Sequence, residues 1–170
     1  MGSVKALHIV GYKNSGKTTL MNHWIRLLTE KGYRVHAIKH HGHQAPLAMP
    51  DERKDSMTYV KSGAHASFVA GASFTQHIIN EELTFQQLKA LATFQAPDLI
   101  LVEGYKREVG DKIVLSRSME DWESLRSVTD IRLVVGVAKS DSYPIIGSRN
   151  DYAKLDAWLL RYMNGGTKVR

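Results

Sequence analysis

The chain has 170 residues, of which 43% are hydrophobic and 24% charged, with a net charge of +6 and no cysteine. This composition fits a globular protein long enough to bury a core, and the lack of cysteine excludes disulfides, thiolate zinc sites and cysteine nucleophiles. No apolar run reaches the ~20 residues of a membrane span and no signal peptide is recognisable, so we expect a soluble cytoplasmic protein without a membrane partner.

The positive charge indicates an anionic partner, such as a nucleotide or a phosphorylated cofactor. A protein that binds nucleic acid usually carries a basic stripe with interleaved aromatic residues. Here the lysines and arginines are scattered along the chain, without a run of five like charges. The distribution therefore does not favour nucleic-acid binding.

The N-terminal part of the chain predicts a strand, a helix and a second strand. Residues 6–10 (ALHIV) form a short apolar run that ends at a glycine, as buried parallel strands do. Apolar residues then recur at helical spacing over 17–31, and RVHAIK at 34–39 has the composition of a strand. Together these segments predict one βαβ unit.

The middle of the chain predicts a long loop followed by smaller elements. Residues 40–53 contain two prolines and show no periodicity, which predicts a loop longer than most connections in compact domains. A short helix capped by Asp55 or Ser56 is expected next, then two strands within 65–79 and a helix from Thr84. The two strands are apolar at alternate positions, so this hairpin could extend a sheet across a two-fold axis or be an ordinary internal hairpin.

The C-terminal half returns to strands and helices. The clearest strand is 98–104 (DLILVEG), and further strands are predicted at 113–116 and 131–138. Apolar residues over 155–162 indicate a closing amphipathic helix. This alternation predicts an α/β protein with a mostly parallel central sheet and helices on both faces, a three-layer arrangement.

We expect one domain, residues 1–164, followed by a flexible C-terminal tail, residues 165–170. No internal repeat or low-complexity segment interrupts the domain.

A phosphate-binding motif lies between the first strand and the first helix. Gly11, Gly16, Lys17 and Thr18 satisfy the Walker A pattern G-x-x-x-x-G-K-[ST]. The glycines let the backbone wrap a phosphate with its N–H groups pointing inward, and the helix that follows presents its positive end to the anion. Lys17 can reach the terminal phosphates and the Thr18 hydroxyl can bind Mg²⁺, while Thr19 adds a hydrogen bond nearby. The motif and its context predict a P-loop.

The acidic partner of this P-loop is predicted to be Glu103. It follows four apolar residues at the C-terminal end of strand 98–104, where ligands gather in open α/β sheets. A carboxylate there can hold Mg²⁺ or orient an attacking water. Asp98 begins the same strand and is too far away, at roughly 16 Å by strand rise, to share the site. An ordinary solvated acid at a strand end is the alternative interpretation of Glu103.

Recognition of the base is indicated only by a partial motif. Lys139 and Asp141 follow strand 131–138 as in the N/T-K-x-D pattern that reads guanine, although Ala138 stands at the first position. Asp141 is therefore a candidate base reader, with a surface turn as the equal alternative.

Three histidines, His40, His41 and His43, lie at the start of the long loop. A zinc, nickel or copper site is one interpretation, because imidazole binds these metals. Three histidines without nearby acids or a second ligand cluster rarely close a site, so we favour a surface on which Lys39 and these donors meet an anionic ligand beside the P-loop.

Four segments together resemble the molybdopterin-guanine dinucleotide biosynthesis protein B (MobB) family. They are GYKNSGKTTL, IKHHGH, RKDSMTYVKSGA and LILVEGYK, in this order and spacing, and the resemblance runs from about residue 5 to residue 107. The P-loop alone is shared by many families, but the K-H-x-x-H, K-D-S and V-E-G-Y-K blocks are far more specific. One departure is Arg53, where we expect a glycine before the K-D-S block.

The resemblance implies a dimeric GTP-binding adapter with at most weak GTPase activity, acting beside a guanylyltransferase that joins GMP to molybdopterin. GTP and Mg²⁺ would be its ligands, with Lys17 and Glu103 in the catalytic positions and Thr18 and Glu103 serving the metal. The implied ligand-binding residues are Gly11, Asn14, Ser15, Gly16, Lys17, Thr18, Thr19, Lys39, His43, Asp55, Ser56 and, for the base, Asp141.

Two other functions remain open at this stage. A P-loop small-molecule kinase would transfer the γ-phosphoryl group to a hydroxyl, and such enzymes usually carry an arginine-rich lid that is not evident here. A GTP-dependent metal-insertion chaperone would need the histidine loop to bind its metal tightly. A phosphorylated acceptor would identify the kinase, and stoichiometric metal would identify the chaperone.

Overall fold

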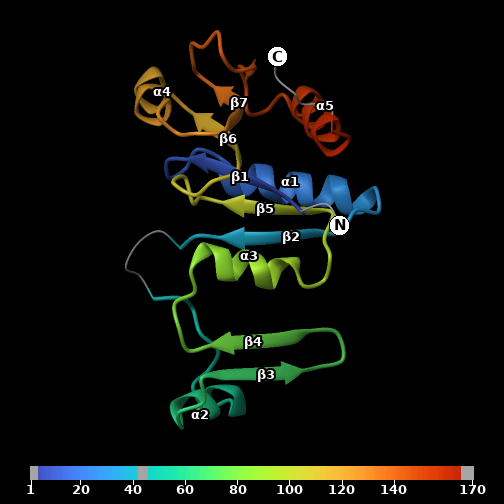
Figure 1. The fold of residues 1–170 in the computed structure, drawn as a ribbon, viewed down its shortest axis with the longest axis vertical. Helices are drawn as coiled ribbons and strands as arrows, with labels where there is room; N and C mark the ends of the chain where they lie inside the picture. Colours follow the sequence, from blue (N-terminus) through green and yellow to red (C-terminus); the bar gives the residue numbers. More distant parts are fainter. Residues whose placement is uncertain (1–3, 42–45, 166–170) are drawn as a thin grey trace. The chain divides into compact units, whose positions relative to one another are not determined.

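The computed structural model describes residues 4–41 and 46–165, which form two compact units. The first unit contains the chain up to His40 and from Leu88 onwards, and the second is His41–Gln87 (Figure 1). The single domain expected over 1–164 stays a prediction. Of the tail expected at 165–170, only Gly165 lies within the described residues.

The first unit is built on a parallel sheet. Its strands are β1 (Lys5–Gly11), β2 (Val35–Lys39), β5 (Leu99–Glu103), β6 (Asp111–Ser116), β7 (Ile131–Gly136) and β8 (Ile145–Ile146). They are ordered β2-β5-β1-β6-β7-β8, and every neighbouring pair is parallel. All strands therefore end at the same edge of the sheet, which is where α/β proteins bind their ligands.

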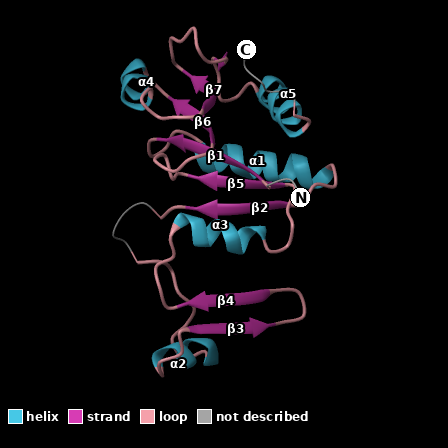
Figure 2. Ribbon diagram, in the orientation of Figure 1, coloured by secondary structure: helices cyan, strands magenta, loops and turns pink. Residues whose placement is uncertain are grey.

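Helices cover both faces of this sheet (Figure 2). Helices α1 (Lys17–Glu30) and α5 (Tyr152–Met163) pack on one face, in a core that includes Leu7, Ile9 and Leu101. Helix α4 (Met119–Leu125) packs on the other face, against Val10 and Val114. Successive strand residues point to opposite faces, so β1 and β6 contribute to both cores. This confirms the expected three-layer α/β fold.

The core of the first face is dense in aromatic and leucine side chains. Leu20, Trp24 and Leu28 of α1 are buried at helical spacing. The ring of Trp24 stacks on Trp158 of α5 with centroids 6.4 Å apart, and its indole N–H donates to Asp156 at 3.2 Å. Each such buried side chain stabilises the fold by about 1.5–3 kcal/mol. This packing fixes the position of α1, and with it the end of the loop that joins β1 to α1.

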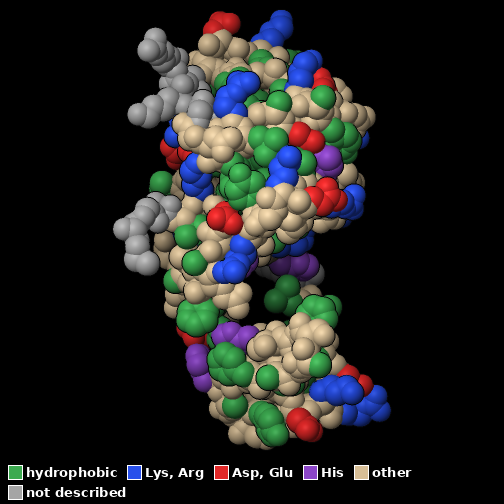
Figure 3. Space-filling model, turned by 90° about the vertical axis from the view of Figure 1, so that its right-hand side faces the viewer, with side chains coloured by type: hydrophobic (Ala, Val, Ile, Leu, Met, Phe, Trp, Pro, Cys, Tyr) green, Lys and Arg blue, Asp and Glu red, His purple; other side chains and the backbone are tan. Residues whose placement is uncertain are grey.

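The second unit consists of helix α2 (Asp55–Lys61) and a two-stranded antiparallel sheet of β3 (Ala66–Ala70) and β4 (Thr75–Ile79). Helix α3 (Phe85–Thr93) begins in this unit and continues into the first. The hairpin exposes large apolar side chains, with Phe68 at 69% and Phe74 at 86% of their full surface. Hydrophobic side chains are accordingly visible on the surface of this unit (Figure 3).

The structure adds two elements to those predicted from the sequence and revises a third. Helix α4 is one: the Ser118 hydroxyl accepts from the Asp121 N–H at 3.1 Å, a cap that the spacing of serine and acid could have indicated. Strand β8 is the other, and two residues are too few to show a periodicity. The third is α3, which begins at Phe85 rather than at the predicted Thr84 and whose Leu91 is 47% exposed.

Candidate functional site

The loop between β1 and α1 has the backbone conformation of a phosphate cradle. Gly16 has φ +96° and Asn14 has φ +63°, so two residues of the loop are left-handed and turn their peptide groups. Glycine adopts this conformation without strain, and asparagine tolerates it. A Cβ at Gly11 would lie 2.7 Å from both the Leu115 carbonyl oxygen and the Ser15 hydroxyl. The two glycines of the motif are thus required, one by conformation and one by space.

The loop leaves the N-terminus of α1 without a side-chain cap. Gly16 is the N-cap residue, so no side chain caps the helix, and its first turn contains no acid. The first N–H groups of a helix have no partner within it and carry its positive partial charge. The Ser15 hydroxyl is buried and has no hydrogen-bond partner within the described chain. Uncapped donors and an unpaired hydroxyl together suit a bound phosphate.

Lys17 lies folded back on the loop. Its ammonium donates to the Tyr12 carbonyl oxygen at 2.8 Å. Burial lowers the pKa of Lys17, and the charges of Lys39 and Arg117 add to this effect, whereas the Glu103 carboxylate opposes it. A flexible side chain held by one carbonyl can turn to a terminal phosphate.

Glu103 sits at the centre of a three-residue cluster at the C-terminal edge of the sheet. Lys39 of β2 and Glu103 of β5 are register partners, and their ammonium and carboxylate lie 2.6 Å apart. The Thr18 hydroxyl donates to the other carboxylate oxygen at 2.9 Å. Thr18 and Glu103, which the sequence analysis assigned to the same metal site, are therefore in direct contact, and Lys39 is the third member of the cluster.

These contacts set the charge of the cluster. Burial by itself raises the pKa of the Glu103 carboxyl. The hydrogen bonds from Lys39 and Thr18 and the charges of Lys39 and Lys17 together outweigh burial, and the pKa lies below its ordinary value. Glu103 is consequently a carboxylate at neutral pH and is fixed in one orientation. A carboxylate so strongly held by donors is a weak base.

Hard oxygen ligands of this kind suit Mg²⁺. The Glu103 carboxylate and the Thr18 hydroxyl offer two oxygens, and the Lys39 ammonium already occupies a cation position on the same carboxylate. Within the described residues no group of three or more histidines, aspartates and glutamates is placed to hold a metal. A Mg²⁺ ion here would therefore depend on phosphate oxygens and water for its other ligands, as it commonly does.

A cavity of about 580 Å³ opens over the P-loop. It is lined by Lys13, Asn14, Gly16, Lys17, Thr18, Thr19, Leu20, Lys39, Glu103, Leu115, Arg149, Asn150 and Tyr152. Most of the residues predicted for phosphate and metal therefore share one cavity. The sequence did not indicate Arg149, Asn150 or Tyr152, because nothing distinguishes the loop before α5 and the first residue of that helix from other polar surface segments.

The remaining predicted residues are placed differently. Asp141 is exposed in the segment after β7 and does not line the cavity. Asp55 and Ser56 begin α2 in the second unit, where Ser56 is buried. His43 lies outside the described residues. The ligand roles of these four residues stay predictions.

The histidines of the long loop are only partly described. The His40 ring packs 4.6 Å from the Tyr105 ring, and His41 is exposed. A metal site on this loop would need His43 as well, so that interpretation also stays a prediction.

A buried histidine lies next to the turn that follows Glu103. His8 of β1 is fully buried, and its Nδ1 lies 3.4 Å from the carbonyl oxygen of Gly104, the residue after Glu103. Burial lowers the pKa of His8 from 6.5 to about 4, and the Gly104 carbonyl opposes this in part. The imidazole is therefore neutral in the folded protein at pH values where the unfolded chain is protonated.

We expect the free energy of unfolding to fall by roughly 2 kcal/mol between pH 7 and pH 4.5 through His8 alone. A folded-state pKa below the unfolded value stabilises the fold above pH 6.5, and this contribution is lost as the pH falls toward 4. Urea unfolding at both pH values measures the effect. A His8→Gln variant should lose less stability over the interval, and an equal loss in both proteins would contradict the assignment.

Comparison with known proteins gives a consistent result. The family model of MobB, molybdopterin guanine dinucleotide synthesis protein B, matches residues 6–139. The molybdopterin-guanine dinucleotide biosynthesis adapter protein of Escherichia coli (strain K12) is 36% identical over 139 residues, 79% of this chain and 78% of that protein. A probable adapter protein of the same name from Bacillus subtilis (strain 168) is 32% identical over 128 residues, 75% of this chain and 74% of that protein.

Solved structures agree with the sequence matches. A MobB protein homolog from Bacillus stearothermophilus has a TM-score of 0.76 at 33% identity, covering 94% of this chain and 98% of that chain. Bacillus subtilis MobB has a TM-score of 0.81 at 27% identity, covering 92% and 97%. The resemblance noted in the sequence is confirmed over nearly the whole chain: it belongs to the MobB family.

Proposed function

We propose that this protein is a GTP-binding adapter in molybdopterin guanine dinucleotide formation, with weak GTPase activity of its own. The observation that carries the proposal is that the P-loop, Thr18 and Glu103 line the same cavity. The P-loop N–H groups and Lys17 would hold the phosphates, and Thr18 with Glu103 would hold Mg²⁺. When bound, Mg²⁺ neutralises phosphate charge and polarises phosphoryl oxygens.

The choice of guanine rests on the family. The related proteins from E. coli and B. subtilis are named for molybdopterin-guanine dinucleotide biosynthesis, so a guanine nucleotide is the simplest ligand. Asp141 is the candidate base reader, in the segment after β7 on the same edge of the sheet. A carboxylate can accept from both the ring N–H and the amino group of guanine.

The state of Glu103 supports the proposal that hydrolysis is slow. The carboxylate that would activate a water is already hydrogen-bonded to Lys39 and Thr18 and has a lowered pKa. Such a group takes up a proton poorly, so general-base catalysis through it is weak. The same contacts keep the cation-binding carboxylate in place. We therefore propose that the cavity retains its nucleotide rather than turning it over.

The adapter role would place the nucleotide at a partner enzyme. Both curated relatives carry the word adapter in their names. The chemistry of a dinucleotide cofactor needs a guanylyltransferase that joins GMP to molybdopterin, and we propose that enzyme as the partner. The low turnover suits a protein that acts through binding, in the cytoplasm where the guanine nucleotides are.

We also propose a homodimer, formed through the hairpin of the second unit. The β3–β4 sheet has only two strands, so both of its outer edges lack a strand partner within the described chain. Isolated two-stranded sheets are marginally stable, and unpaired edges readily accept further strands. Phe68, exposed on β3, would be covered by the second copy.

Titration with GTP and ATP, each with Mg²⁺, tests nucleotide binding by calorimetry. We expect GTP to bind in preference to ATP and the Lys17→Ala variant to lose at least tenfold in affinity, because the terminal phosphates lose a charged donor. Lys31→Ala is the matched control, since it removes the same charge at the far end of α1. Preference for ATP, together with a phosphorylated acceptor, would point to the kinase instead.

The adapter role is tested by reconstitution with a molybdopterin guanylyltransferase. We expect added protein to increase the rate of dinucleotide formation at limiting GTP, and Lys17→Ala to give a much smaller increase. Product is measured by chromatography of the released cofactor. An equal rate with and without the protein would exclude a direct role in this step.

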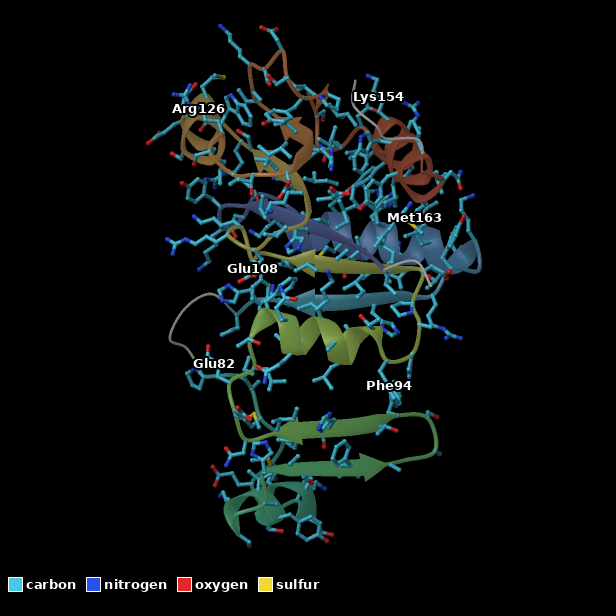
Figure 4. All side chains as sticks on the ribbon, in the orientation of Figure 1. Glu82, Phe94, Glu108, Arg126, Lys154 and Met163 are labelled. Carbon is cyan, nitrogen blue, oxygen red and sulfur yellow. The ribbon has the colours of Figure 1, made fainter. Side chains whose placement is uncertain are left out.

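The dimer is tested by sedimentation velocity. Phe68→Asp should shift the protein toward monomer, because a carboxylate placed in an apolar interface costs several kcal/mol to bury. Phe94→Asp, after helix α3 (labelled in Figure 4), is a control with a similarly exposed side chain, at 87%. A monomeric unmodified protein, or equal dissociation by both variants, would contradict the hairpin interface.

A further inference from the structure

Arg149 reaches the P-loop from a part of the chain remote in sequence. It lies on the segment that joins β8 to α5, and its Nη1 is 3.5 Å from the Asn14 carbonyl oxygen. Its Cδ would lie 3.5 Å from a Cβ at Gly16, and the side chain lines the cavity. The guanidinium thus stands at the mouth of the phosphate cradle.

The Arg149 guanidinium has no carboxylate partner among the described residues. Lys39 is paired with Glu103, and Arg117 is held by the two carboxylate oxygens of Asp121 at 2.8 and 3.2 Å. Arg149 is exposed and forms no ion pair among the described residues; its contact with the Asn14 carbonyl is long for a hydrogen bond. An arginine held at an anion site without a carboxylate partner is available to a phosphate, whose geometry its planar fork matches.

The sheet order fixes the side from which Arg149 approaches. Glu103 and Lys39 end β5 and β2, on one side of β1. Arg149 follows β8, on the opposite side of β1. The P-loop comes directly after β1, in the middle. The cavity therefore has a carboxylate end and an arginine end, with the cradle between them.

The charges that line the cavity favour one orientation of a bound nucleotide. Thr18 and Glu103 would hold Mg²⁺, which neutralises charge on the terminal phosphates, so these phosphates would lie near Thr18 and Glu103. The α-phosphate and the nucleoside then extend away from Glu103, toward the segment that contains Arg149 and Tyr152. Tyr152 is fixed there, because its ring packs 4.3 Å from the His23 ring of α1.

We propose that Arg149 binds the α-phosphate of the nucleotide, an inference that rests on the proposed nucleotide-binding function. The contact would anchor the nucleoside half of the ligand, and it would be made equally with a nucleoside triphosphate and with a diphosphate. This separates Arg149 from an arginine that serves the transferred phosphoryl group, whose effect would require the γ-phosphate.

The test is calorimetric titration of the unmodified chain and of Arg149→Ala and Arg149→Lys with GTP·Mg²⁺ and GDP·Mg²⁺, at two KCl concentrations. Arg149→Ala should weaken both nucleotides by the same factor, about 10- to 100-fold, as expected for loss of a charge-assisted hydrogen bond. Its affinity should also depend less on salt, because one phosphate contact is gone. Arg149→Lys should recover part of the loss. Arg126→Ala, at the C-cap of α4 (labelled in Figure 4), removes the same charge outside the cavity and should bind normally.

The other outcomes overturn the assignment in distinguishable ways. A loss for GTP alone would place Arg149 on the γ-phosphate, and an equal loss with unchanged salt dependence would place it on the base. Normal binding by Arg149→Ala would exclude a direct contact while leaving the proposed function intact. Failure of the unmodified chain to bind either nucleotide would overturn both.

Discussion

The parallel pairing of the strands in the first unit is the constraint on which the site depends. Since all of these strands run the same way, the residues after β1, β2 and β5 meet at one edge, although they are remote in sequence. The P-loop, Lys39 and Glu103 are brought together by this geometry alone. The same pairing places Glu103 opposite Lys39 in the register, so the ion pair at the centre of the site is a cross-strand contact. The site is thus a direct consequence of sheet topology.

The core keeps this edge rigid. The first turn of α1 contributes Thr18 to the site, and the following turns bury Leu20 and Trp24 against the sheet. A displacement of α1 would have to open that packing, which costs several kcal/mol for each large side chain exposed. Buried His8, packed beneath Gly104, supports the turn after β5 in the same way. The loop before α1 is therefore supported by the packing of the helix that follows it.

Much of this arrangement could be predicted from the sequence, because it follows from local patterns. The P-loop is a contiguous motif, and Glu103 ends an apolar run whose direction is set by the βαβ unit. Two features could not be predicted. The Lys39–Glu103 pair depends on which strands are neighbours, and strand order is not encoded in periodicity. Arg149 depends on where a loop without periodicity passes, and the two-residue strand before it gives no signal.

The distribution of charge in the cavity is the physical basis of the proposal that this protein binds a nucleotide and hydrolyses it slowly. Phosphate binding needs positive charge, which the helix terminus, Lys17 and Arg149 supply. Fast hydrolysis needs a free base near the terminal phosphate, yet the carboxylate at that position is bound by Lys39 and Thr18. The hydrogen bonds from Lys39 and Thr18 help to lower the pKa of Glu103 and so weaken it as a base. The contacts around Glu103 therefore bear on the proposed slow turnover, whereas the proposed retention of a nucleotide depends on the positive charges that line the cavity.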